Sequence, residues 1–215
     1  MLYAWQKRLL GNVVPVKLIF DEAGQFTQQL DAGLWKFTLI GGGGGGALNK
    51  NPRTTSVSYA RGGVGGTLQA IVNLPFATEI TINVGSAGLS DTQFSQGSKG
   101  TDGGKTEITG ISGVTLQANG GTGAEVTASV QRIAGVQGQN IITGAKSIIA
   151  NNTNIITSTT GSALVSRQPV RKPTGQKNTN WTEDQTKGQG GDCGWYQNAL
   201  IKMNGGLGFV MIENA

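Results

Sequence analysis

Few side chains in this sequence could do chemistry, and none of them stands in a catalytic pattern. The 215 residues include no histidine, which excludes Ser-His-Asp and Cys-His mechanisms and imidazole zinc sites within one chain. The single cysteine, Cys193, has no base beside it in Gly191-Asp-Cys-Gly194, so we expect a passive thiol and no internal disulfide. These features predict a protein that is not an enzyme and that uses neither a cofactor nor a metal.

Two weaker chemical signals need weighing. Gly103-Gly-Lys-Thr106 resembles the end of a phosphate-binding loop, but Lys99 stands where that motif requires a glycine. The residues after it predict a strand, whereas phosphate is held at the N-terminus of a helix, so we reject a nucleotide site. A glycosidase would need two carboxylates facing one sugar bond, and no motif pairs them here. The carboxylates that the fold could still pair are Asp91, Asp102, Glu107, Glu183, Asp184 and Asp192.

Residues suited to binding lie late in the chain. Trp181 stands in a polar loop, and residues 166–180 carry basic side chains and no acid. Exposed aromatic and basic side chains suit sugar faces or protein contacts. Trp195 and Tyr196 flank the last strand, and we expect them to be buried. The predicted receptor or partner contacts are Trp181, Arg167, Arg171 and Lys172.

The composition indicates a packed β-protein. Glycine accounts for 36 residues, while only 13% of residues are charged, about half the ordinary share. Segments rich in Val, Ile and Thr separate the glycine runs, which argues against disorder. The glycines keep no strict three-residue period and only 5 prolines accompany them, which excludes collagen.

The clearest element is a strand over residues 33–40, in which Trp35, Phe37 and Leu39 alternate with polar residues. It leads directly into six glycines, 41–46. Glycine loses much backbone freedom on ordering, so such a run is ordered only where backbones pack closely, as in polyproline-II-like helices or at a sheet edge. Further strands are predicted at 13–20, 25–30, 67–74, 79–84, 105–109, 114–118 and 209–213.

These strands, with turn signals between them, predict an all-β fold. We expect an antiparallel β-sandwich, jelly-roll-like, with glycine-rich loops and polyglycine-II segments. Residues 31–215 form the glycine-rich β domain, with a polar insertion at 138–204. Within the insertion the pairs Ile141-Ile142, Ile148-Ile149 and Ile155-Ile156 recur seven residues apart, which suits a binding loop, a solenoid-like element or a short helix.

The N-terminal residues 1–30 are predicted to be an attachment segment. Its first residues carry Tyr3, Trp5 and Leu9, which we expect to anchor the protein to a larger particle. They do not form a signal peptide, and no apolar run approaches the roughly 20 residues that cross a bilayer. We therefore expect synthesis in a cytoplasm and release by lysis or within a particle.

The order of strands and glycine runs is similar to that of a known family. The succession GLWKFTLIGGGGGG, GGVGGTLQAIVNLP, TEITINVGSAG, GGKTEITG, LQANGGTG and GGLGFVMIENA resembles the glycine-rich domain found at the tips of bacteriophage tail fibres and in related surface proteins. The resemblance covers roughly residues 31–124 and 205–213. Residues 125–204 are less glycine-rich than is usual in that family, and residues 1–30 have no counterpart in it.

The resemblance implies a β-sandwich-like body, presented as an oligomer for attachment to a host cell. The expected function is that of a fibre-like virion structural protein, located in the virion, that attaches to a host-surface glycan or protein through exposed loops. The alternatives are a capsid or tail decoration or assembly protein and a glycan-degrading spike enzyme. Expected partners are other virion proteins, bound through the N-terminal segment, and further copies of the chain, a trimer by analogy with fibres. The net charge of +5 includes no dense basic cluster, so nucleic acid is not expected.

Overall fold

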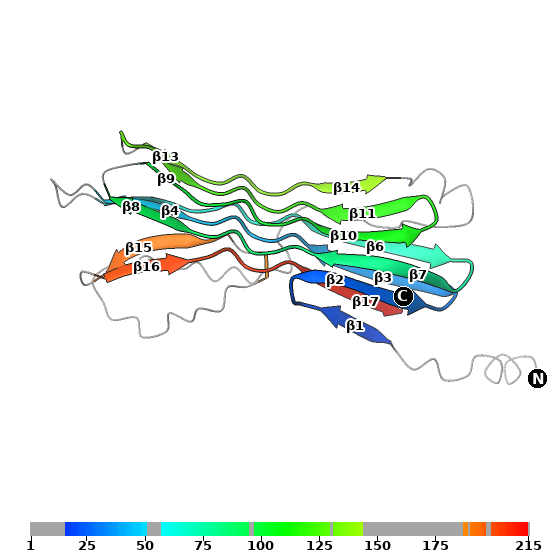
Figure 1. Ribbon diagram of the computed structural model, residues 1–215. Coiled ribbons are helices and arrows are strands. Elements are labelled where there is room, and N and C mark those ends of the chain that lie inside the picture. The colour runs from blue at the N-terminus through cyan, green and yellow to red at the C-terminus, as the bar shows by residue number, and fades with distance from the viewer. Residues whose placement is uncertain are drawn as a thin grey trace, which may run out of the picture.

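The computed structural model describes residues 16–50, 57–94, 97–129, 131–143, 187–188, 190–196 and 199–214. Within these residues the protein consists of strands, extended segments and turns, without a helix. The molecule is elongated and has three regions along its length (Figure 1). We call them the near sandwich, which carries both ends of the described chain, the glycine lattice in the middle, and the far stack.

The near sandwich consists of two antiparallel sheets packed face to face, as the sequence predicts. The four-stranded sheet has the order β1 (Lys17–Phe20), β17 (Phe209–Asn214), β3 (Gly33–Ile40) and β6 (Thr67–Leu74). The five-stranded sheet has the order β14 (Asn140–Thr143), β11 (Val114–Ala118), β10 (Thr106–Ile111), β7 (Thr78–Val84) and β2 (Gly24–Leu30). Alternate side chains of the two sheets form the apolar core, which includes the predicted buried residues Trp35, Phe37 and Leu39.

The sandwich begins earlier than the predicted domain boundary at residue 31. β1 pairs with β17 along its length, and β2 pairs with β7 from Gly24 to Leu30. Leu30 is fully buried in the core, where Leu18, Phe20 and Phe26 also pack. Residues 17–30 are therefore part of the sandwich, and the attachment role predicted for residues 1–30 stays a prediction. The polar insertion likewise contributes strands, because β14 lies inside its predicted limits of 138–204.

The far stack consists of three small sheets in three layers. The middle sheet has the order β5 (Val57–Ala60), β4 (Ala47–Lys50) and β8 (Asp91–Phe94). On one side of it lie β13 (Arg132–Ile133), β12 (Glu125–Val126) and β9 (Ser98–Lys99), and on the other lie β15 (Asp192–Tyr196) and β16 (Ala199–Met203) (Figure 1). Among the side chains that the structure describes in the stack, Ala47, Ala60, Ala124 and Val126 form a buried apolar cluster of small residues.

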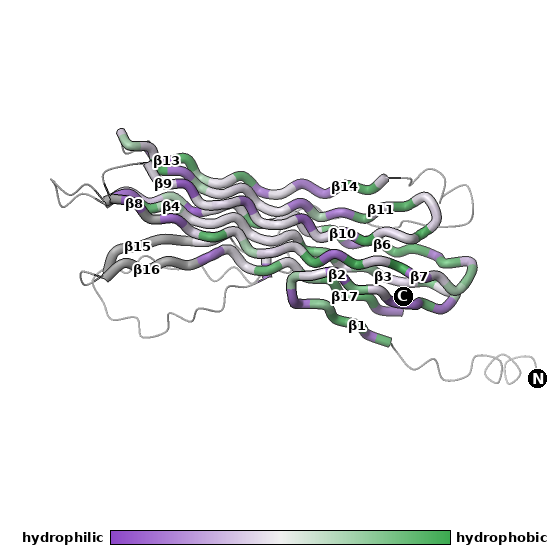
Figure 2. Tube along the Cα trace, viewed as in Figure 1, coloured by the Kyte–Doolittle hydropathy of each residue, from purple (hydrophilic) through white to green (hydrophobic). Residues whose placement is uncertain are grey.

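The glycine lattice joins the two ends through eight extended segments. Figure 2 shows it as a pale band of nearly neutral hydropathy beside the near sandwich, where green apolar positions are frequent. The chain runs through the lattice alternately toward the far stack and back. The segments are 41–46, 61–66, 85–90, 100–105, 119–124, 134–139, 187–191 and 204–208, with residue 189 outside the described part.

The hexaglycine segment Gly41–Gly46 is the centre of the lattice. Successive amides of residues 41–45 donate to segments 61–66, 100–105 and 204–208 in turn, at N···O distances of 2.8–2.9 Å. The order repeats after three residues, which is the period of a polyproline-II-type helix. Carbonyls of the same segment accept from the three remaining neighbours, 85–91, 119–124 and 190–191. The central segment thus has six neighbours, and the prediction that the hexaglycine is ordered by close backbone packing is confirmed.

Position in the lattice explains where glycine is required. A Cβ on Gly42, Gly44 or Gly45 would overlap the carbonyl oxygen of Ser86, Thr122 or Leu89 on a neighbouring segment. Gly41 is equally constrained, since its Cβ would overlap the carbonyl oxygen of Asn119, so neighbours on several sides of the central segment require glycine there. A segment at the rim needs glycine only on its inward side, three residues apart, as at Gly135 and Gly138 of the outermost segment.

The lattice also lets strands exchange partners. In the near sandwich β3 lies between β17 and β6, whereas its continuation β4 lies between β5 and β8 in the far stack. A strand offers hydrogen bonds in two directions, but a helix with three residues per turn offers them in three. The lattice can therefore convert two layers into three. The conversion places β4 beside β8, which runs in the same direction through the molecule, and their pairing is accordingly parallel.

Candidate binding surface at the far stack

The far stack brings together connections that are distant in the sequence. Because the chain crosses the lattice in alternate directions, β4–β5, β8–β9, β12–β13 and β15–β16 all connect at this end (Figure 1). The connections begin after residues 50, 94, 126 and 196, so they come from widely separated parts of the chain. Loops held on a rigid scaffold are the usual place for binding residues. This end is therefore the candidate binding surface.

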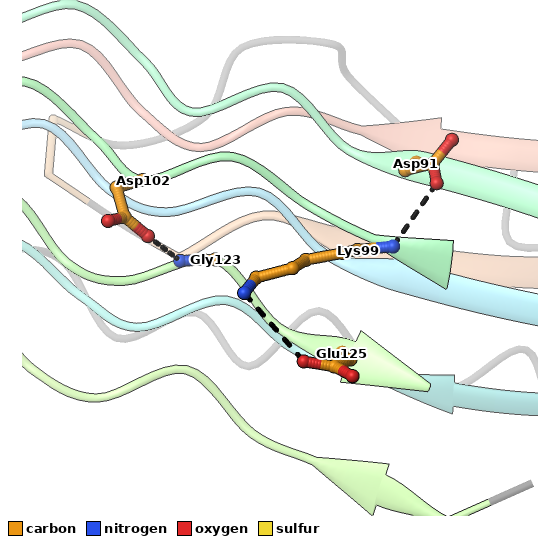
Figure 3. Close-up of polar contacts among 5 residues, drawn as sticks. All are labelled: Asp91, Lys99, Asp102, Gly123 and Glu125. Carbon is orange, nitrogen blue, oxygen red and sulfur yellow. Dashed lines mark hydrogen bonds and ion pairs between the residues drawn. The ribbon is translucent and has the colours of Figure 1, made fainter. Parts of the chain in front are cut away.

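A seam of polar contacts joins two layers of the stack beneath these loops. The backbone amide of Lys99 on β9 donates to Asp91 Oδ2 on β8 at 3.1 Å, and Lys99 Nζ lies 3.8 Å from Glu125 Oε2 on β12 (Figure 3). Asp102, in the adjoining lattice segment, accepts from the amide of Gly123 at 2.7 Å. These carboxylates therefore fix neighbouring strands and lattice segments relative to one another.

Two hydroxyl groups hold the central segment where it enters and leaves the lattice. At the entry, Thr106 Oγ1 is buried, donates to Ile40 O at 2.7 Å and accepts from Gly85 N at 3.0 Å. At the exit, Ser90 Oγ accepts from Gly46 N at 2.8 Å. Each hydroxyl bonds a backbone group at the point where a strand gives way to the lattice. The far stack is therefore joined firmly to the sandwich.

One edge of the far stack carries an aromatic and basic pair that the sequence analysis missed. The Arg132 guanidinium on β13 lies over the Tyr59 ring of β5, with its carbon 5.5 Å from the ring centroid. Ile133 beside it is 51% exposed, and Val136 in the following lattice segment is 67% exposed. The sequence did contain a signal for these residues, because each stretch between two glycine segments has to reverse direction at one end of the lattice.

The predicted contact residues are not tested by this geometry. Trp181, Arg167, Arg171 and Lys172, together with the predicted anchors Tyr3, Trp5 and Leu9, lie outside the described residues. Cys193, Trp195 and Tyr196 are on β15, whose backbone pairs with β16, and their side chains are outside the description. The predicted binding role of the first four residues and the predicted burial of Trp195 and Tyr196 remain predictions.

The carboxylates considered for glycan cleavage have structural contacts instead. Asp91 and Asp102 accept backbone amides, as described above, and Glu107 Oε2 lies 2.9 Å from Lys105 Nζ. Figure 3 shows Asp91 and Asp102 at separate places in the seam. Glu183 and Asp184 lie outside the described residues, and of Asp192 only the backbone is described. The described part of the chain thus brings no two of these carboxylates to one site.

The described residues include no group of three or more Cys, Asp or Glu side chains that could hold a metal ion. They also include no helix of the length and hydropathy needed to cross a membrane.

Comparison with known families agrees with the architecture. A family model described as "Glycine-rich domain" matches residues 21–214. The chain belongs to this family. The matched span of the glycine-rich domain includes β2 and runs to the end of β17, so it contains the whole lattice and every described strand except β1. No curated protein matches the chain.

Proposed function

We propose that this glycine-rich domain is a fibre-like structural module of a virion, which attaches the particle to a host surface through the loops of the far stack. The observation that carries the proposal is the alternate crossing of the lattice. It gathers four connections at one end of a rigid body, with the ends of the described chain at the other. The resemblance of the strand and glycine order to tail-fibre tips supports the same function.

The placement of the chain ends gives the module a direction. Val16 and Asn214 lie side by side at the near end, where Val16 N donates to Asn214 Oδ1 at 3.2 Å and Asn214 N donates to Val16 O at 3.3 Å. Residues 1–15, with the expected anchors Tyr3, Trp5 and Leu9, start from this end. The particle would therefore hold the near sandwich, and the far stack would face the host.

A cell-binding experiment tests the proposal. Labelled protein is incubated with susceptible host cells, and the bound fraction is compared among three proteins: the wild type, a variant with Gly-Ser replacing residues 128–130 and 51–56, and a control with the near-end turn 75–77 replaced. We expect the far-end variant to lose binding and the control to keep it. If only the near-end replacement abolishes binding, the direction of the module is wrong.

The alternatives give different results in the same experiment. A decoration or assembly protein of the capsid or tail would bind no susceptible host cell but would bind particles that lack it. A glycan-degrading spike would release oligosaccharides from host polysaccharide, which the contacts of Asp91, Asp102 and Glu107 do not favour.

We further propose a homo-oligomer, a trimer by analogy with fibres. Sedimentation of the full chain measures the mass of the assembly.

A further inference from the structure

The outer face of the five-stranded sheet carries a row of threonines, one on each strand. Thr27 on β2 pairs with Thr81 on β7, and Thr81 pairs with Thr109 on β10. Ile108 pairs with Leu116, and Thr109 follows it at the point where the register between β10 and β11 shifts. Thr115 on β11, the residue before Leu116, pairs with Thr143 on β14. Neighbouring strands lie about 4.8 Å apart, so the four intervals of the row span about 19 Å. We call this surface the threonine face.

The hydroxyl groups of this row are accessible. Thr27 and Thr143 are exposed and the three central threonines are half-buried. Their hydroxyls make no hydrogen bond within the described part of the chain. Threonine is branched at Cβ and has few χ1 rotamers, so the row presents hydrogen-bond donors and acceptors with little conformational freedom.

The next row of the same face is also polar. It contains, in register across the strands, Gln25, Asn83, Glu107, Gln117 and Ile141. Amide side chains donate and accept hydrogen bonds, as hydroxyls do. The face therefore offers two adjacent rows of uncharged hydrogen-bonding groups, interrupted by one carboxylate and one isoleucine.

The charges on this face are mostly negative. Glu79 on β7 is exposed, and Glu107 on β10 forms an ion pair with Lys105, 2.9 Å away. No strand of this sheet carries a lysine or arginine. An anionic polymer would meet repulsion here, whereas a neutral one would not.

The outer face of the four-stranded sheet has a different character. Lys36 and Glu213 form an ion pair of 2.8 Å there, and Ile19 is 53% exposed. It carries opposite charges and apolar side chains without a hydroxyl row. The threonine row therefore occurs on one sheet only of the sandwich as described, and the general preference of threonine for β-strands does not explain it.

We propose that the threonine face binds a neutral polysaccharide chain lying across the strands. Sugar hydroxyls both donate and accept hydrogen bonds, so they match fixed hydroxyl and amide rows, and the lack of cations on the strands selects against acidic polysaccharides. The face belongs to the near sandwich and lies apart from the loops of the far stack. It therefore provides a second binding surface, and the proposal does not depend on the function of those loops.

Affinity electrophoresis of the full chain tests the proposal. The gels contain a dextran, a mannan or a β-glucan as neutral polymers and a polyuronate as the acidic one. We expect at least one neutral polymer to retard the wild type and the polyuronate not to. The variant Thr81→Val/Thr109→Val keeps the branched side chain but loses two hydroxyls, and we expect its affinity for that polymer to fall at least tenfold. Thr81→Ser/Thr109→Ser keeps the hydroxyls and should remain within threefold of the wild type.

Several outcomes would overturn the proposal. The first is that none of the three neutral polymers retards the wild type. The second is that the valine variant binds as the wild type does and has the same thermal stability. The third is that the serine variant loses as much affinity as the valine variant. If sedimentation shows self-association that the valine variant abolishes, the occupant of the face is a second copy of the chain. Replacement of residues 51–56 and 128–130 should leave the retardation unchanged, so failure of this proposal and failure of the host-attachment proposal are distinguishable.

Discussion

The near sandwich and the glycine lattice are parts of one continuous chain, but different interactions hold them together. The sandwich buries apolar side chains such as Phe37, Leu39 and Ile82 between two sheets. The lattice has no apolar core in its described segments and consists of backbone groups bonded to other backbone groups. Hydrophobic burial is not directional, whereas a hydrogen bond requires a particular distance and angle. The sandwich can therefore adapt to changes in side chains, and the lattice cannot.

The energetics of the two regions differ accordingly. Burying one large apolar side chain contributes about 1.5–3 kcal/mol. Ordering a glycine costs about 0.5–1 kcal/mol more than ordering an alanine, and a backbone hydrogen bond returns a net of about 0.5–1.5 kcal/mol. These last two terms are of similar size, so a lattice segment gains little by itself. It is ordered because the strands at its two ends fix it beside its neighbours.

The substitution Gly44→Ala should have the largest effect, because it introduces a side chain at the centre of the lattice. The new Cβ would overlap Thr122 O, a backbone atom that cannot rotate away. Overpacking commonly costs about 1–3 kcal/mol, and a clash with backbone on a surrounded segment should exceed about 4 kcal/mol. Urea unfolding measures the loss. Gly97→Ala is the matched control, since Gly97 is exposed and its Cβ would have its nearest neighbour at 3.3 Å. Equal effects at the two positions would contradict the lattice argument.

Phe37→Ala tests the other region. Phe37 is fully buried in the sandwich, so the truncation removes apolar contacts and leaves a cavity, at a cost of about 3–5 kcal/mol. Phe37→Leu should cost much less, because cores tolerate hydrophobic residues of similar volume. Thermal unfolding of both variants provides the comparison. A leucine variant as unstable as the alanine variant would show that the sandwich is as intolerant as the lattice.

The junctions between the regions should show an intermediate effect. Thr106→Val removes the hydroxyl that bonds Ile40 O and Gly85 N, and leaves two buried backbone groups without that partner. Each unsatisfied group costs about 1–3 kcal/mol, so the variant should lose at least that much stability. Ser90→Ala removes the hydroxyl that accepts from Gly46 N at the opposite junction, and it should lose less stability because it leaves one backbone amide without that partner. Hydrogen exchange should report faster exchange at Gly85 in the first variant and at Gly46 in the second.

Sequence patterns predicted the sandwich better than the far stack. The alternation of Trp35, Phe37 and Leu39 identified β3, and Ile80, Ile82 and Val84 identified β7, because these strands bury one face in an apolar core. In the far stack, three successive residues of β4, Ala47, Leu48 and Asn49, are all buried, so this strand shows no alternation of apolar and polar residues. Short strands, two to five residues long, add to the difficulty.

Glycine runs predicted close backbone packing but not which segments pack together. The six neighbouring segments of residues 41–46 include one as distant in the sequence as 204–208. Nothing in the sequence indicates which segments become neighbours or how they align. The predicted contact residues had a different weakness. The prediction for Trp181 rests on the polar residues around it in the sequence, and composition carries no geometry. The sequence does not predict the pair of Tyr59 and Arg132, because 73 residues separate its members.

The smallest effect is expected at the rim, where the lattice argument can be tested within a single segment. Val136 lies in the outermost segment and is 67% exposed, so Val136→Ser should change the free energy of unfolding by less than about 0.5 kcal/mol. Gly138, two residues later, faces inward, and its Cβ would overlap Asn119 O. Gly138→Ser should therefore destabilise the protein strongly, although both variants place serine in the same segment. If the two variants unfold at the same urea concentration, the inward and outward sides of the segment are not distinguished, and position in the lattice does not determine where glycine is required.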